Sequence, residues 1–105
     1  MTLKELIEFL EKLNPSATTM KGFHNPHSWR GAYNELSFEP RETATTAYMM
    51  LHTARLCVGR EFTGYKGGKY PMTLDTLCHI DHEGFCYNEV MTKEQLCKMF
   101  GLIDT

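Results

Sequence analysis

The chain has 105 residues, of which 42% are hydrophobic and 23% are charged, and its formal net charge is -2. This length supports one hydrophobic core, and the composition is that of a globular chain rather than a disordered one. The net charge gives no general attraction to nucleic acid, no apolar run reaches membrane-spanning length and no signal peptide opens the chain, so we expect one cytoplasmic domain (residues 1–105) without membrane contact.

The first predicted element is a helix that starts after Thr2. Thr2 and Glu5 have the spacing of a capping box, in which each side chain bonds the backbone N–H of the other residue. Apolar side chains then recur at helical spacing, at positions 3, 6, 7, 10 and 13. The helix is expected to end at Asn14-Pro15, because a residue before proline is disfavoured in helical conformation.

Residues 22–40 are the most informative stretch, because imidazole, hydroxyl, indole, guanidinium and phenol groups crowd into ten positions of it. Asn25-Pro26 predicts a turn between His24 and His27, so we interpret this part as a loop that presents a site. Residues 30–38 alternate loosely between apolar and polar and predict a strand, which Glu39-Pro40 is expected to end.

The remaining elements alternate between helix and strand. Residues 43–58 predict a second helix capped by Thr43. Residues 61–65 and 74–81 predict two strands joined by a glycine turn at 66–69, and residues 85–90 predict a hairpin with the strand before them. A third helix is predicted from Thr92, with Gln95 in the reciprocal capping position, to about Gly101. The predicted fold class is α+β, a small antiparallel sheet packed with about three helices.

Four cysteines, at positions 57, 78, 86 and 97, are expected to be reduced thiols, because an even count without an export signal is weak support for disulfides. In an extended segment Cys78, His82 and Cys86 point to one face, so a metal site is conceivable there. Their spacing matches no zinc ribbon or finger. We therefore interpret them as half-buried structural residues and predict neither a metal nor another cofactor.

The side chains of the informative stretch favour an anionic ligand. Arg30 offers a planar fork of donors, and the turn at 66–69 places two lysines around two glycines whose N–H groups can approach an oxyanion. Arg55 and Arg60 are expected to extend the same positive region. Aromatic side chains beside these cations can stack on a base or a guanidinium, although they are also good core residues. The candidate ligand-binding residues are His24, His27, Ser28, Trp29, Arg30, Tyr33, Tyr65, Lys66, Gly67, Gly68 and Lys69.

No complete catalytic set accompanies these residues. His27 and Ser28 are adjacent, and adjacent residues of an extended chain point apart, so a proton relay between them is geometrically poor. Glu35 and Glu39 face the same way on the predicted strand and are expected to pair with Arg30 rather than to bind a metal. The turn at 66–69 is not a P-loop, because it lacks the Gly-Lys-Ser/Thr ending.

Two runs of this sequence carry a resemblance to a known family. Residues 22–40 read Gly-Phe-x-x-Pro-His-Ser-Trp-Arg-Gly-x-Tyr-x-x-Leu-x-Phe-Glu-Pro, and residues 62–72 read Phe-Thr-Gly-Tyr-Lys-Gly-Gly-Lys-Tyr-x-Met. This order and spacing, over about residues 22–82, is similar to that of a family of small, largely uncharacterised proteins of tailed bacteriophages. The resemblance implies a phage product that acts in the cytoplasm of the infected host, where proteins of this size are commonly inhibitors of host defence, accessories of DNA metabolism or adaptors.

Two function classes follow. The first is a non-enzymatic inhibitor of a host defence system that captures a small nucleotide-derived signal or blocks a host protein. The second is a small nucleotide-processing hydrolase that uses His24 or His27 with Arg30. The missing catalytic set favours the first class. We also expect a homo-oligomer with the site near its interface, because a chain of 105 residues rarely forms a deep pocket alone.

Overall fold

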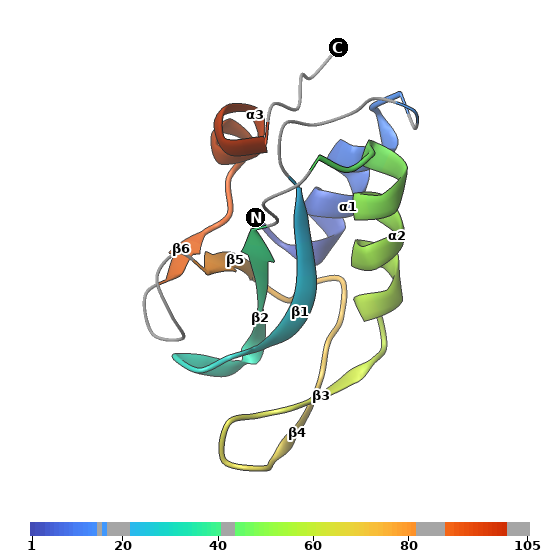
Figure 1. The fold of residues 1–105 in the computed structure, drawn as a ribbon. Helices are drawn as coiled ribbons and strands as arrows, with labels where there is room; N and C mark the ends of the chain where they lie inside the picture. The colour runs from blue at the N-terminus through green and yellow to red at the C-terminus, as the bar shows by residue number, and fades with distance from the viewer. Residues whose placement is uncertain (15, 17–21, 41–43, 82–87, 101–105) are drawn as a thin grey trace.

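The computed structural model describes residues 1–14, 16, 22–40, 44–81 and 88–100, with the backbone only for residues 88, 89 and 98–100. Three helices and six strands occur there in the order α1, β1, β2, α2, β3, β4, β5, β6, α3 (Figure 1). This confirms the predicted α+β class. No helix within the described residues is both long and apolar enough to cross a membrane.

The helix α1 (Leu3–Glu11) starts as predicted, with Thr2 as its N-cap, but it ends at Glu11, before the predicted end at Asn14-Pro15. The Thr2 hydroxyl accepts the backbone N–H of Glu5 at 3.2 Å, and the Glu5 carboxylate accepts the N–H of Thr2 at 3.0 Å. The Glu5 carboxylate also accepts the Thr2 hydroxyl at 3.1 Å, and the bonds that it accepts from the Thr2 N–H and hydroxyl lower the pKa of Glu5. The apolar side of α1 is buried and supplies Leu3, Leu6, Phe9 and Leu10 to the core.

The helix α2 (Ala47–Cys57) begins later than predicted. Thr46, not Thr43, is its N-cap, and its hydroxyl accepts the N–H of Met49 at 3.2 Å. Several threonines precede the helix, and the sequence alone does not distinguish which of them caps it. The helix α3 (Lys93–Phe100) has the predicted reciprocal cap between Thr92 and Gln95. Gly101, where α3 was expected to end, lies outside the described residues.

The prediction of a loop around Asn25-Pro26 is wrong, because residues 23–29 form the strand β1 (Phe23–Trp29). Irregular pairing between His24 and His27 marks a bulge, and Asn25 has a φ of 48°. The bulge admits the proline into a strand that pairs on one side only. Its partner β2 (Ala32–Pro40) also continues through the Glu39-Pro40 pair that was expected to end it.

Four strands form the main sheet in the order β1-β2-β5-β6, with β5 at Cys78–Asp81 and β6 at Asn88–Val90. The pairs β1–β2 and β5–β6 are antiparallel, the second in agreement with the predicted hairpin, whereas β2 and β5 run parallel, so the prediction of a wholly antiparallel sheet is wrong. The predicted hairpin partner of residues 61–65 is wrong. The strand β3 (Glu61–Thr63) pairs instead with the unpredicted strand β4 (Lys69–Pro71), because the glycine turn closes the hairpin at once.

The two faces of the main sheet differ in chemistry. One face packs with the helices around a core that includes Phe23, Leu36, Phe38, Met50, Ile80 and Leu96. On the other face the register aligns His27, Ser37 and His79 across three strands. Because side chains alternate along a strand, Glu35, Glu39 and Asp81 lie on this same face. Many of the polar side chains singled out in residues 22–40 therefore gather on one side of the sheet.

Candidate functional site

Three imidazole–carboxylate pairs lie on the polar face of the sheet, two of them between neighbouring strands and one, His27–Asp81, from β1 to β5 across β2. The His79 Nε2 lies 2.6 Å from the Glu35 Oε1, the His27 Nε2 lies 3.8 Å from the Asp81 Oδ2, and the His24 Nε2 lies 3.9 Å from the Glu39 Oε2. The His79 side chain is 3% exposed and the His24 side chain 47%, so the pairs run from the interior to the surface. The predicted ion pairs of Glu35 and Glu39 with Arg30 are wrong, because these glutamates pair with His79 and His24 instead.

Trp29 is part of the structure of this face. Its indole lies against the imidazole of His79, with ring centres 4.0 Å apart. Gly31 passes so close to the indole that a Cβ there would come within 2.6 Å of the Trp29 ring. The indole Nε1 and the His79 Nδ1 are both buried without a hydrogen-bond partner. The stacking capacity of Trp29 is thus used inside the protein rather than offered to a base.

Ser28 is also held by the fold. Its side chain is buried, and its hydroxyl donates to the backbone carbonyl of Tyr33 at 2.5 Å, across the β1–β2 turn. Its register partner is the buried Leu36, whereas the partner of His27 is Ser37 on the polar face. The expectation that His27 and Ser28 point apart is confirmed, and Ser28 is placed to close a turn rather than to act as a nucleophile.

Tyr33 connects β2 to the β3–β4 hairpin. Its ring centre lies 5.5 Å from that of Tyr70 in β4. Gly64 sits against both rings, since a Cβ there would come within 2.8 Å of Tyr70 and 3.3 Å of Tyr33. This packing fixes the hairpin beside the β1–β2 pair and accounts for a glycine directly after β3.

Hydrogen bonds within the glycine turn account for its glycines as well. The Gly64 N–H donates to the Gly68 carbonyl at 2.6 Å, and the Gly67 N–H donates to the Gly64 carbonyl at 2.9 Å. Gly67 has a φ of 94°, a conformation that side chains disfavour. These two N–H groups are therefore used within the turn, while Lys66 and Lys69 are exposed on either side of it.

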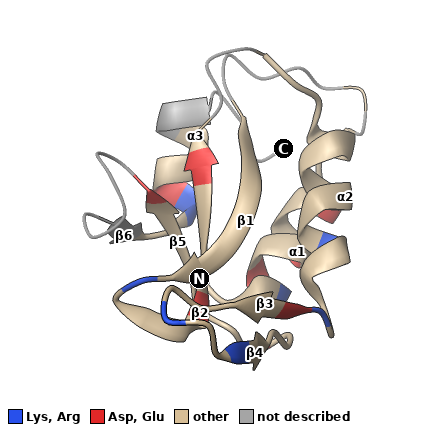
Figure 2. Ribbon diagram, turned by 60° about the horizontal axis from the view of Figure 1, so that its bottom comes forward, with Lys and Arg blue, Asp and Glu red and all other residues tan. Residues whose placement is uncertain are grey.

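Arg30 and Tyr65 bring the two singled-out runs together. The guanidinium of Arg30 lies 3.8 Å from the centre of the Tyr65 ring, and both side chains line a pocket of about 250 Å³. In Figure 2 the basic segments of the β1–β2 turn and of the β3–β4 hairpin are neighbours. The pocket is lined by Asn25, His27, Ser28, Arg30, Glu39, Thr63 and Tyr65.

Two other predicted members of the positive region are bound elsewhere. The Arg55 guanidinium is 2.6 Å from the Glu11 carboxylate on α1, and that of Arg60 lies 4.7 Å from the centre of the Phe62 ring. Sequence reasoning missed Asn25, Glu39 and Thr63 as pocket residues. Asn25 and Glu39 lay within the stretch already singled out, but their positions at the pocket depend on the β1–β2 register.

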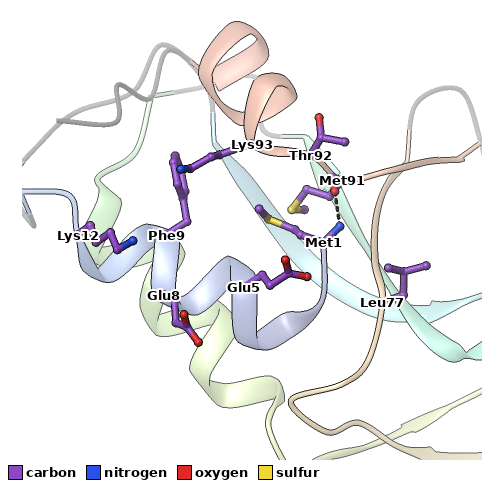
Figure 3. Close-up of a pocket in the computed structure, with 9 residues that line it drawn as sticks. All are labelled: Met1, Glu5, Glu8, Phe9, Lys12, Leu77, Met91, Thr92 and Lys93. Atoms are coloured by element: carbon purple, nitrogen blue, oxygen red, sulfur yellow. Dashed lines mark hydrogen bonds between the residues drawn. The ribbon is translucent and has the colours of Figure 1, made fainter.

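A second and larger cavity, of about 580 Å³, lies between α1 and the chain just before α3 (Figure 3). Phe9 and Met91 give it apolar walls, and the Met1 amino group donates to the Met91 carbonyl beside them at 2.5 Å. Glutamates and lysines stand around these walls, Glu5 and Glu8 on α1 among them. No motif in the sequence indicated this cavity, because its walls come from a regular amphipathic helix and a loop.

Two of the described cysteines, Cys57 and Cys78, are buried, and Cys97 is partly buried. Burial raises the pKa of Cys57 to about 11 and that of Cys78 to about 12. Among the residues that the structure describes, no group of three or more His, Cys, Asp and Glu side chains is arranged to hold a metal ion. His82 and Cys86, the other members of the conceivable site, lie outside these residues.

Comparisons of the chain with protein-family models, with curated proteins and with solved structures find no match.

Proposed function

We propose that this protein is a phage-encoded, non-enzymatic binder that inhibits a host defence system by capturing a small nucleotide-derived signal. The observation that supports it most is the stacked Arg30–Tyr65 pair at the pocket of about 250 Å³. The phage origin and the defence target are supported by the resemblance of residues 22–40 and 62–72 alone.

The chemistry of the pocket suits a nucleotide. The guanidinium of Arg30 can pair with phosphate through its fork of N–H donors. Its stacking on the Tyr65 ring holds the plane of the guanidinium in place. An aromatic ring beside a cation also supplies a surface for a base, worth about 1–3 kcal/mol per stacked base. Asn25, Thr63 and Glu39 add amide, hydroxyl and carboxylate partners for the polar edge of a base or sugar.

The exposed hairpin tip supports capture. Lys66 and Lys69 lie on the same hairpin as Tyr65. This hairpin therefore brings two more cations near a ligand that is bound at Arg30. We propose that the tip, residues 64–70, closes over the ligand as a lip. The packing of Gly64 and Tyr70 on Tyr33 holds the two ends of this tip, so closure is a movement of the residues between them.

A binding experiment tests this function. Titration calorimetry with adenosine 5′-monophosphate should show binding to the wild type that Arg30→Ala weakens by about 1.5–3 kcal/mol, the value of a hydrogen bond to a charged group. Thermal melting of the variant is the control, because Arg30 is exposed and its loss should leave the fold intact. Unfolding of Arg30→Ala with unchanged affinity per folded molecule would show that Arg30 is structural.

Turnover separates capture from the alternative, a hydrolase. The His27–Asp81 pair, with 3.8 Å between Nε2 and Oδ2, favours the alternative, because a carboxylate commonly orients a catalytic imidazole. The protein is incubated with the nucleotide and denatured by heat, and the released ligand is analysed by mass spectrometry. Intact ligand supports capture, a new product supports hydrolysis, and no bound ligand at all leaves direct blocking of a host protein.

We further propose that the protein self-associates through α2. Its outward side exposes Tyr48, Met49, His52 and Leu56, with Tyr48 and Leu56 both more than half exposed. None of these four residues is Lys, Arg, Asp or Glu, so two copies can meet there without like-charge repulsion between them. Light scattering should report a dimer or larger assembly for the wild type and a monomer for Leu56→Glu; a monomeric wild type would contradict the proposal.

A further inference from the structure

We propose that Glu39 determines the specificity of the Arg30 pocket, so that the pocket selects a ligand with one anionic end and hydrogen-bond donors at its other end. This inference rests on the proposed nucleotide binding and assigns the roles of the two ends of the site. Arg30 holds the phosphate, and Glu39 accepts from hydroxyl or amino groups and repels a second phosphate.

The carboxylate of Glu39 is both fixed and accessible. Its Oε2 accepts the side-chain amide of Asn25 at 2.7 Å, while the side chain remains 35% exposed beside the pocket. An ionised carboxylate has two acceptor oxygens, so one bond to Asn25 leaves acceptor capacity for a ligand. A group that is held by the protein before a ligand arrives loses little conformational freedom on binding it.

The backbone that holds this carboxylate is unusual. Asn25 has a φ of 48°, which a side-chain-bearing residue rarely adopts, and proline follows it. Strained conformations of this kind persist where the surrounding structure enforces them, and they concentrate at binding sites. Here the strained residue is the one whose side chain bonds Glu39, so the bulge in β1 aims the amide at the carboxylate.

The pocket is polarised along the β1–β2 pair. Glu39 pairs with His24 near one end of that strand pair, whereas Arg30 lies in the turn at its other end (Figure 1). The only carboxylate that lines the pocket is that of Glu39, and its only guanidinium is that of Arg30, among the residues that the structure describes. A ligand that spans the pocket thus meets a cation at one end and an anion at the other.

Two nucleotide probes test this polarity. Adenosine 5′-monophosphate carries one phosphate and offers sugar hydroxyls and a base amino group, whereas adenosine 3′,5′-bisphosphate carries a second phosphate in place of the 3′ hydroxyl of its ribose. Simple attraction to Arg30 and the lysines would favour the bisphosphate. We expect the opposite for the wild type, with the monophosphate bound at least tenfold more tightly in titration calorimetry.

Glu39→Gln should bring the two affinities within threefold, chiefly by strengthening binding of the bisphosphate. The matched control is Glu61→Gln, which removes the same charge from an exposed position on β3 outside the pocket lining and should keep the tenfold preference. Asn25→Gly provides a second route if Glu39→Gln folds poorly. Glycine tolerates the positive φ but frees the carboxylate, so the preference should fall with the charge retained.

The outcomes separate the two proposals. If Arg30→Ala weakens both probes while Glu39→Gln leaves their ratio unchanged, the nucleotide site stands and the role of Glu39 is refuted. If the wild type prefers the bisphosphate, the role of Glu39 is refuted as well. If neither probe binds the wild type, both the proposed function and this inference are overturned.

Discussion

The indole of Trp29 and the imidazole of His79 lie one against the other, with ring centres 4.0 Å apart, on the polar face of the sheet. The contact joins β1 to β5 across β2, which separates them in the sheet. It also covers a histidine that is already bound to Glu35. Trp29, one of the aromatic residues predicted either to stack on a ligand or to pack in the core, therefore makes a structural contact.

Replacing Trp29 by alanine should destabilise the fold by about 3–5 kcal/mol, as for other large aromatic side chains packed in a protein. Chemical unfolding in urea measures this loss. Tyr65→Ala is the matched control, because Tyr65 is 64% exposed and its removal should change the free energy of unfolding by only about 0.5 kcal/mol. Equal losses for the two variants would contradict the distinction between a structural and a ligand-facing aromatic residue.

Replacing Thr2 by alanine should cost about 0.5–2 kcal/mol of stability, because the N–H of Glu5 then loses its acceptor at the start of α1. Thr2→Ser retains the hydroxyl and should lose much less. Thermal melting of the two variants beside the wild type measures the difference. If serine is as damaging as alanine, the contribution of Thr2 comes from its methyl group rather than from the cap.

Cys57 and Cys78 should resist alkylation by iodoacetamide at pH 8 in the native protein and react in urea. Both thiols are buried, and burial raises the pKa of Cys57 to about 11 and that of Cys78 to about 12, so the reactive thiolate is scarce in the fold. Peptide mapping by mass spectrometry follows each site. Cys97, which is only partly buried, is the internal reference and should react faster; equal rates would show that burial does not protect the other two.

The same two thiols should make the fold less stable at alkaline pH. Their pKa values are raised in the folded state above the ordinary value of 9.0, so the unfolded chain releases its protons first as the pH rises. The stabilisation is complete below about pH 9 and is lost progressively toward about pH 11–12. Urea unfolding at pH 8–11 should show a shallower loss for Cys78→Ala, by up to about 1.4 kcal/mol per pH unit, than for the wild type. Parallel curves would contradict it.

Replacing Lys66 and Lys69 together by glutamine should remove the salt-dependent part of nucleotide binding. The wild type should bind several-fold more weakly as ionic strength rises, because exposed cations are screened by salt. The double variant should bind weakly at low salt and change little. Lys4→Gln on α1 with Lys12→Gln at its C-cap is the matched control for net charge. If both double variants behave alike, the hairpin lysines have no special role.

The sequence predicted local structure well where the signal was local. The capping boxes of Thr2 and Thr92 and the apolar stripe of α1 depend on residues within a few positions of each other. The α+β class was predicted from these helical patterns together with the short extended runs between them. The parallel pairing of β2 with β5 was not, because it joins residues such as Leu36 and Cys78, between which no local pattern acts.

Prediction of the site failed and succeeded for similar reasons. Grouping the two motif runs around Arg30 agrees with their contact through Tyr65, but the ion pairs proposed for Glu35 and Glu39 were wrong. Arg30 was the simplest predicted partner for these glutamates, because it is a nearby cation in the sequence. The actual partners, His79 and His24, were fixed by strand order and by the bulge at Asn25, which residue types do not reveal.

The parallel pairing of β2 and β5 also determines at which stage of folding the pocket forms. The connection between these strands contains α2 and the whole β3–β4 hairpin, so Tyr65 is carried within a long crossover. Closing such a crossover requires contacts between distant parts of the chain, which form slowly compared with a hairpin or a helix. A chain that has formed α1 and the β1–β2 hairpin but not yet docked the crossover has Arg30 without Tyr65. Ligand recognition at this pocket is therefore a property of the completed fold, and nascent or truncated chains that stop before β5 should not compete for the ligand.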